Sequence, residues 1–151
     1  MRAILQRVSN ASVKVADEVV GEIAKGVLVL LAVEHQDGPA ERKALVEKMA
    51  GLRLFEDQDG KMNLDTAQAG GAFLVVSQFT LAASLRRGRR PSFDGSAKPE
   101  KAEPMVEAVM ADLRNKGFEV AGGRFGAHME VALTNDGPVT FVLDVREGKV
   151  A

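Results

Sequence analysis

The alternation of hydrophobic and polar positions predicts a chain in which β-strands outnumber helices. Near the N-terminus it predicts a hairpin that turns at Asp17 and Glu18, formed from residues 2–8, 12–15 and 19–23. Residues 26–33, GVLVLLAV, are apolar without a break, which is typical of a strand covered on both faces. This part of the chain is therefore expected to lie in a sheet.

Two segments have the apolar spacing that is typical of helices. The first is expected to begin with Asp37 as its cap and Pro39 in its first turn, and to end at Gly51. The second is expected to run from about Glu100 to Lys116. The apolar stripes are Leu45, Met49 and Leu52 in the first helix and Val106, Val109, Met110 and Leu113 in the second.

The rest of the chain adds short strands and one long loop. Residues 53–64 predict a strand, a turn at Asp59 and Gly60, and a short return, while residues 72–76 predict a buried strand that leads into SQFTL at 77–81. The remaining segments are a loop at 82–104 and strands at 118–121, 129–133 and 139–145, with residues suited to a hairpin turn at 135–137. These elements predict an α/β fold: a single layered domain of mixed β-sheets with hairpins, packed with two main helices, over residues 1–151.

Composition and charge exclude several classes of function. Of the 151 residues, 46% are hydrophobic and 27% are charged, which suits one globular domain. The absence of cysteine excludes disulfides, thiol nucleophiles and cysteine zinc sites, and we expect no metal or other cofactor. A net charge of −1 gives no overall field to attract nucleic acid. The longest apolar run is too short for a membrane span and no signal peptide is recognisable, so a cytoplasmic protein is expected.

A local patch of positive charge lies in LRRGRRPSF. Its arginines are Arg86, Arg87, Arg89 and Arg90. Guanidinium groups form paired hydrogen bonds with phosphate oxygens, so this loop could follow a phosphate backbone. The alternative is a solvated loop whose charge serves solubility. The residues alone leave both interpretations open.

Other candidate sites have a simpler explanation. Residues 57–63, DQDGKMN, resemble a calcium loop but lack its late glutamate, which favours a hairpin turn. Residues 122–126, GGRFG, lack the strand–loop–helix context of a nucleotide site, which favours a flexible turn. His35 and His128 are far apart in the sequence and no G-x-S-x-G motif accompanies them, so each is expected to be a surface or loop residue.

Two polar segments are candidate parts of an active site. SQFTL places Ser77, Gln78 and Thr80 at the end of a buried strand, where a ligand could bind, but the residues alone favour polar groups that cap the strand, since no base lies near them in the sequence. In the second segment Gly137 precedes Pro138, and a cis peptide costs little at such a bond. A cis peptide here could aim backbone carbonyl groups at a substrate amine, but the residues alone favour a trans turn.

Together these segments resemble the D-aminoacyl-tRNA deacylase family. SQFTL at 77–81 is followed by GRRPSF at 88–93 and TNDGPVT at 134–140. QRVSNASVKV near the N-terminus, FEDQDGKMN in the middle and RFGAHM before the last strands are also similar to the family. The resemblance covers nearly the whole chain, and it implies the fold of that family.

The resemblance implies an enzyme that hydrolyses the ester bond of D-aminoacyl-tRNA, and of mischarged glycyl-tRNA, and rejects L-aminoacyl-tRNA. It implies an oxyanion site of backbone N–H groups near Phe79, in a catalytic pocket formed by Ser77, Gln78, Phe79 and Thr80. It also implies a homodimer in which a cis Gly137–Pro138 peptide enters the other subunit's site. In that arrangement Arg7 braces the peptide and Met129 lies close to the site.

Several functional details are left open. Position 128 is often aspartate or another polar residue in relatives, so a role of His128 in substrate entry is not decided. The expected partner is tRNA, with the four loop arginines on its phosphates, and neither DNA nor a membrane is expected. Either Thr80 attacks the ester or the 2′-OH of the tRNA assists water; the second is preferred because Thr80 has no evident base. A non-catalytic tRNA-binding module and a hydrolase of small esters are the alternative functions.

Overall fold

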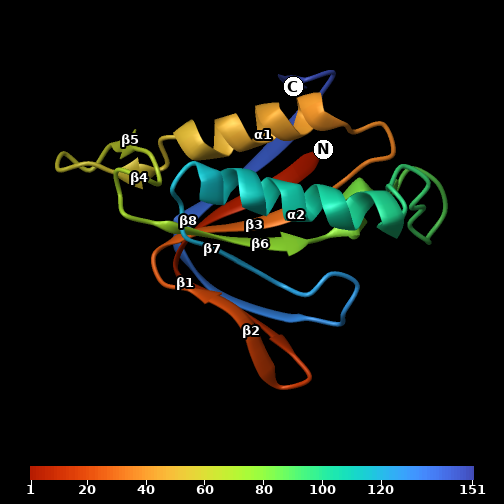
Figure 1. The fold of residues 1–151 in the computed structure, drawn as a ribbon, viewed down its shortest axis with the longest axis horizontal. Coiled ribbons are helices and arrows are strands. Elements are labelled where there is room, and N and C mark those ends of the chain that lie inside the picture. The colour runs from red at the N-terminus through yellow and green to blue at the C-terminus, as the bar shows by residue number, and fades with distance from the viewer.

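The computed structural model describes residues 1–151. Its elements, in chain order, are β1 (Arg2–Val15), β2 (Glu18–Ile23), β3 (Gly26–Ala32), α1 (Pro39–Gly51), β4 (Phe55–Glu56), β5 (Met62–Leu64), β6 (Ala72–Ser77), the 3₁₀ turn η1 (Phe79–Ala82), α2 (Pro99–Asn115), β7 (Val120–Gly122), β8 (Glu130–Arg146) and β9 (Lys149–Val150). Figure 1 shows α1 and α2 side by side over one face of the sheet, with the β1–β2 hairpin extending away from them. The predicted α/β fold with two main helices is confirmed. None of its helices combines the length and hydropathy that a membrane crossing requires.

The main sheet is built around two long strands, β1 and β8. Its strand order is β7-β6-β3-β1-β8-β9, and β2 pairs with the second half of β1. The β3–β6 and β6–β7 pairs are parallel, while β1 is antiparallel to β2, β3 and β8. The sheet curls until β2 meets β7, where a Cβ atom at Gly21 would lie 2.2 Å from the carbonyl oxygen of Gly122. Only a glycine permits this close approach.

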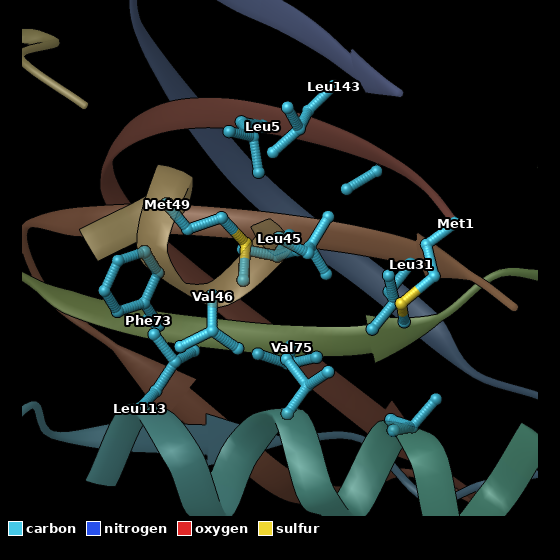
Figure 2. Packing of buried hydrophobic residues seen from close by; sticks show 14 of the residues in the cluster. Met1, Leu5, Leu31, Leu45, Val46, Met49, Phe73, Val75, Leu113 and Leu143 are labelled. Atoms are coloured by element: carbon cyan, nitrogen blue, oxygen red, sulfur yellow. The ribbon is translucent and has the colours of Figure 1, made fainter. Parts of the chain in front are cut away.

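The two faces of the sheet bury different apolar residues. Beneath the helices, strand residues Leu5, Leu31, Phe73 and Val75 belong to one core with helix residues Leu45, Met49 and Leu113 (Figure 2). On the opposite face, a second core inside the curl contains Val13, Ile23, Leu28, Leu74 and Val76. Strands β3 and β6 are thus covered on both faces, as their continuous apolar sequences predict.

One apolar row on the β1–β8 part of the sheet is left partly uncovered. Ile4 of β1 pairs with Val142 of β8 on one side and Leu30 of β3 on the other. Directly paired residues point to the same face, so these three side chains lie in a line. Val142 is 66% exposed, and Ile4 and Leu30 are half-buried. Leu30 packs against the inner core, so the row leads from that core to an exposed apolar side chain, Val142, at the surface of β8.

The strands predicted at 129–133 and 139–145 are one continuous strand, β8. Asn135, Asp136 and Gly137 therefore do not connect two arms of a hairpin. The register of β8 against β1 shifts between Gln6 and Asn10, so the segment 135–139 is a bulge on a long strand. Turn-forming residues predict a chain reversal here, but the pairing with β1 on both sides of the bulge keeps the strand continuous.

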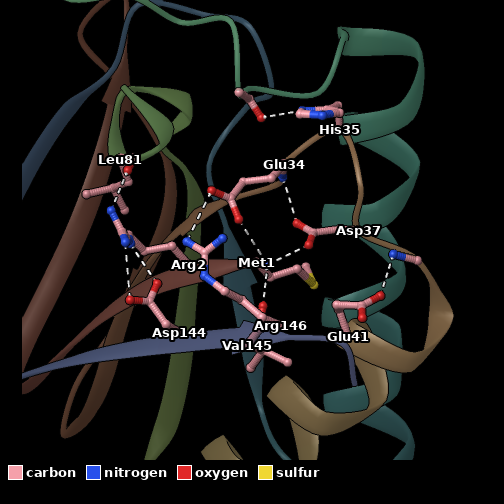
Figure 3. Close-up of polar contacts among 12 residues, drawn as sticks. Met1, Arg2, Glu34, His35, Asp37, Glu41, Leu81, Asp144, Val145 and Arg146 are labelled. Atoms are coloured by element: carbon pink, nitrogen blue, oxygen red, sulfur yellow. Dashed lines mark hydrogen bonds and ion pairs between the residues drawn. The ribbon is translucent and has the colours of Figure 1, made fainter. Parts of the chain in front are cut away.

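Asp37 does not cap α1; Gly38 occupies the N-cap position. The Asp37 carboxylate, which is 5% exposed, instead lies 2.6 Å from the α-amino group of Met1 and accepts the N–H of Glu34 at 2.6 Å (Figure 3). The same amine donates to the carbonyl oxygen of Val145 at 2.9 Å. The first residue of the chain is thereby fixed between α1 and β8. At the second helix, α2 begins at Pro99, so the loop predicted for 82–104 is shorter than expected.

Candidate active site

The SQFTL segment lies where two parallel strands end together. Ser77 closes β6 in register with Leu31 of β3, and the N–H of Gln78 donates to the Leu31 carbonyl at 2.8 Å. The chain then turns into η1, whose first N–H groups, those of Phe79 and Thr80, bond to no backbone group of a neighbouring element. Such free donors at the start of a helical turn are available to a ligand oxygen.

Arg2 holds η1 against the sheet. Its Nη1 donates to the Leu81 carbonyl at 3.3 Å, while its Nε and Nη2 bind the Asp144 carboxylate at 2.7 and 3.2 Å (Figure 3). Hydrogen bonding from this guanidinium lowers the pKa of Asp144 below its ordinary value, and the carboxylate raises the pKa of Arg2. The pair is therefore charged at neutral pH and fixes the end of η1 relative to β1 and β8.

An apolar pocket of about 410 Å³ opens beside this segment. Its lining comprises Leu31, Val33, Ser77, Phe79, Phe93, Ser96, Ala97, Lys98, Pro99, Ala102, Val106, Phe125 and Gly126. Phe79 and Phe93 face each other at a ring-centroid distance of 5.0 Å, and both are exposed. Flat aromatic surfaces at the mouth of an apolar pocket suit a planar group such as a nucleobase.

Two of the predicted catalytic residues, Ser77 and Phe79, line this pocket, and the other two lie next to it. The side-chain amide of Gln78 donates to the hydroxyl of Thr80. A donor cannot remove the Thr80 proton, and no carboxylate or imidazole bonds to that hydroxyl. His35 is exposed and its Nδ1 lies 3.2 Å from the Gly95 carbonyl, while His128 is exposed and lines none of the major pockets. Neither histidine reaches Thr80 as a base.

The Gly137–Pro138 peptide is cis, and both residues are exposed. Arg7 lies directly behind the segment: its Nε donates to the Asp136 carbonyl at 2.9 Å and its Nη1 donates to the Leu54 carbonyl at 2.8 Å. Because Arg7 is only 5% exposed, its guanidinium is a buried link between β1, the bulge and the start of the β4–β5 hairpin.

Gly137 and Ser77 of one chain lie far apart. Through the pairs Ser77–Leu31, Leu31–Ala3 and Ala3–Leu143, Ser77 is level with the end of β8, whereas the bulge is level with Arg7. Three strand spacings and about four residues along the strands separate them, a distance on the order of 20 Å. The pocket of a chain is therefore not completed by its own Gly137–Pro138 peptide.

The other predicted residues have different surroundings. Met129 is half-buried, packs against the inner core of the curl, and its sulfur accepts the N–H of Arg124 at 3.4 Å, next to pocket residue Phe125. It supports the pocket loop without lining the pocket. The four arginines at positions 86, 87, 89 and 90 are all exposed on a loop closed by paired backbone bonds between Ser84 and Ser92.

The fold and pocket define a class of α/β protein with a strand-end site that lacks cysteine and an activating histidine, and the comparisons agree on its family. The sequence model described as D-Tyr-tRNA(Tyr) deacylase matches residues 4–144. D-aminoacyl-tRNA deacylase of Symbiobacterium thermophilum is 55% identical over 144 residues, covering 95% of each chain, and that of Chloroflexus aurantiacus is 56% identical over 147 residues, covering 97% of this chain and 92% of the relative. The chain belongs to the D-Tyr-tRNA(Tyr) deacylase family. The predicted resemblance, and with it an enzyme family, is confirmed.

Solved structures share the fold. A structure described as c-Myc DNA Unwinding Element Binding Protein is 37% identical with a TM-score of 0.91, covering 97% of this chain and 99% of that chain. A probable eukaryotic D-amino acid tRNA deacylase superposes with a TM-score of 0.83 over 95% of this chain and 98% of its own. At 18% identity the second likeness concerns the fold alone.

Sequence reasoning missed three residues of the pocket wall, Phe93, Phe125 and Lys98. Phe93 and Phe125 lie within GRRPSF and RFGAHM, segments that carry the family resemblance, but nothing in their local pattern places them beside Ser77. They meet there because the loop before α2 and the loop after β7 both return to the end of β6. The one sequence signal that could have identified Phe93 and Phe125 is that each is a phenylalanine in a loop segment without hydrophobic periodicity.

Proposed function

We propose that the protein hydrolyses the ester bond of D-aminoacyl-tRNA and releases the free D-amino acid and tRNA. The observation that supports this most directly is the pocket of Ser77 and Phe79, built on the family motif at the end of β6 in a member of the deacylase family. Relatives more than half identical over nearly the whole chain are named for this activity. The deacylase domain comprises residues 1–151 and acts in the cytoplasm, where aminoacyl-tRNA is consumed in translation.

The reaction uses positioning more than side-chain chemistry. The terminal adenosine enters the apolar pocket, and the N–H groups of Phe79 and Thr80 stabilise the oxyanion that forms when water attacks the ester carbonyl. The neighbouring 2′-OH of the tRNA orients this water, and the 3′ oxygen leaves with a proton. Thr80 is not the nucleophile, because its hydroxyl has only the Gln78 amide as a partner. An aminoacyl ester is already activated, so oriented donors can supply the several kcal/mol required.

The Gly137–Pro138 peptide selects the enantiomer from a second copy of the chain. It is exposed, braced by Arg7, and on the order of 20 Å from its own Ser77, so it is available to another subunit's pocket. The uncovered row formed by Ile4, Leu30 and Val142 supports a homodimer through this side of the sheet. Fixed backbone beside the α-carbon excludes L-amino acids, whereas D-amino acids and achiral glycine are accepted.

The arginine loop supplies the contact with tRNA. Its four exposed guanidinium groups lie on the chain between Phe79 and Phe93, the two aromatic residues at the pocket mouth. With a net charge of −1 the whole molecule does not attract polyanions, so a local basic loop is the natural docking surface for phosphates.

The decisive experiment compares tRNA charged with D-tyrosine, L-tyrosine or glycine. We expect rapid release of D-tyrosine, release of glycine, and L-tyrosine release no faster than without enzyme. Binding of all three without hydrolysis would leave a tRNA-binding module instead. Rapid cleavage of simple amino acid esters in the absence of tRNA would point to a hydrolase of small esters.

A further inference from the structure

We infer that Asn135 is a positioning residue that fixes the Gly137–Pro138 segment and thereby determines how strictly L-substrates are rejected. The inference rests on the proposed function, because it concerns the same enantiomer selection. Asn135 is half-buried at the base of the bulge and lines none of the major pockets, so its effect on a substrate is indirect.

The Asn135 side chain joins the two ends of the bulge through hydrogen bonds. Its Oδ1 accepts the N–H of Val139 at 2.9 Å, and its Nδ2 donates to the Val139 carbonyl at 2.9 Å and to the Arg7 carbonyl at 3.2 Å. Both ends of the four-residue excursion are therefore joined by one amide group, which also ties them to β1. This pattern uses one acceptor and two donor bonds at once, which neither a carboxylate, with no donor, nor a hydroxyl, with one donor, can reproduce.

The guanidinium of Arg7 secures the same segment from within the protein. It holds the Asp136 carbonyl at 2.9 Å and lies 3.5 Å from the Asp136 carboxylate. The backbone carbonyl of Arg7 is also an acceptor for Asn135. Arg7 thus binds the bulge at both Asn135 and Asp136, and Gly137 and Pro138 remain exposed at its tip.

The bulge is compact enough that this support matters. A Cβ atom at Gly137 would lie 2.4 Å from the N–H nitrogen and 2.6 Å from the Cγ2 of Val139, so the tip folds back on the residue that Asn135 anchors. A backbone selector discriminates mirror images by steric exclusion, which requires placement to within a fraction of an ångström. Without the Asn135 hydrogen bonds, Gly137 and Pro138 can move away from the substrate, and L-aminoacyl-tRNA is then accepted.

The test compares Asn135→Ala and Asn135→Asp with a matched control, Asn10→Ala. Asn10 lies one strand away in the same β1–β8 ladder, is exposed, and donates only to Thr134 Oγ1 and Ser9 Oγ at 3.3 and 3.5 Å. For each protein, kcat/KM is measured with tRNA bearing D-tyrosine and L-tyrosine, and thermal unfolding monitors the fold. We expect the D/L ratio to fall about tenfold or more in both Asn135 variants, mainly through faster cleavage of the L-ester, and to stay unchanged in Asn10→Ala.

Two outcomes separate this inference from the proposed function. If the wild-type protein hydrolyses neither ester, the proposed function fails. If the wild type is D-selective and a folded Asn135→Ala or Asn135→Asp protein keeps the same D/L ratio, even with lower stability, then Asn135 is merely structural and the inference is overturned. Asn135→Asp retains the acceptor for the Val139 N–H, so it keeps the test available should the alanine variant not fold.

Discussion

At the scale of single residues, the buried polar side chains of the protein hold backbone. Arg7, Asn135 and Asp37 are partly or wholly buried, and each bonds to a main-chain group of another segment. Beside the pocket, Gln78 bonds to Thr80, and the Thr80 hydroxyl has no carboxylate or imidazole partner. Deacylase activity is therefore expected to tolerate loss of the Thr80 hydroxyl better than loss of a side chain that positions the backbone, such as Arg7 or Asn135.

Thr80→Ala tests whether a side chain acts as nucleophile. We expect kcat/KM on D-tyrosyl-tRNA to remain within about tenfold of the wild type, because the Thr80 N–H is kept and its hydroxyl has no base. Loss of a true nucleophile costs several orders of magnitude. A covalent aminoacyl adduct on Thr80, detected by mass spectrometry, would contradict the expectation.

Asp37→Asn tests the buried pair with the Met1 amine. Asparagine still accepts the Glu34 N–H but removes the charge nearest the buried Met1 ammonium, which keeps only the Glu34 carboxylate at 3.6 Å, so the free energy of unfolding should fall by up to about 3 kcal/mol. Urea denaturation at pH 7 measures it. The control, Asp59→Asn in the exposed β4–β5 turn, should change stability by less than about 0.5 kcal/mol. Equal stability of the two variants would show that the pair contributes nothing.

At the scale of elements, periodicity predicted what depends on local pattern and missed what depends on pairing. The strands β3 and β6 and the helices α1 and α2 follow from apolar runs and stripes. The continuity of β8 does not, because Asn135 to Gly137 are turn formers and only β1, on the far side of the sequence, keeps the strand extended through the bulge. The same limit applies to the pocket, whose motif residues Ser77 and Phe79 were identified while its loop walls were not.

Glu41 ties α1 to the C-terminal hairpin and gives stability an acid limit. Its carboxylate accepts the N–H of Gly38 at 2.8 Å and of Gly148 at 2.7 Å, and these backbone bonds lower the pKa of Glu41 in the folded state. The stabilisation is complete above the ordinary glutamate pKa and is lost as pH falls through the lower folded value.

We therefore expect Glu41→Gln to be less stable than the wild type at pH 7 and the difference to shrink as pH falls below the ordinary glutamate pKa of about 4.3 and through the lowered folded value. Urea midpoints across this range provide the measurement. Glu47→Gln, on an exposed position of the same helix, is the control and should run parallel to the wild type. A stability difference between Glu41→Gln and the wild type that does not change with pH would exclude the Glu41 carboxylate charge as its cause.

The arginine loop makes a prediction about salt. Arg86→Ala combined with Arg87→Ala should weaken tRNA binding and reduce the slope of log K against log salt by about 0.7–0.9 for each lost phosphate contact. Arg53→Ala, an exposed arginine that bonds to Asn63 in another region, should leave the slope unchanged. Identical slopes in the wild type, the double variant and Arg53→Ala would show that Arg86 and Arg87 do not contact tRNA phosphates and that the loop is a solvated surface.

At the scale of the whole molecule, the curled sheet separates the pocket from the Gly137–Pro138 peptide and leaves Val142 exposed at the end of the Ile4–Leu30–Val142 row. If this row is the proposed subunit contact, Val142→Asp should produce a folded monomer in analytical ultracentrifugation whose D/L ratio falls, because the pocket no longer receives the peptide of a second copy. Ala132→Asp, at an exposed position near the other end of β8, adds the same charge away from the row and should stay dimeric and D-selective. A dimeric, D-selective Val142→Asp protein would show that the row is not the subunit contact.

An enzyme whose pocket lies at the end of β6 and whose Gly137–Pro138 peptide lies within β8 carries a concentration threshold in its architecture. If a second copy supplies the peptide, as proposed, dilution below the dissociation constant separates the pocket from the peptide that excludes L-amino acids. The isolated subunit would keep the backbone donors of its pocket and lose that barrier, so a cell that synthesises too little of this chain would lose discrimination between the enantiomers.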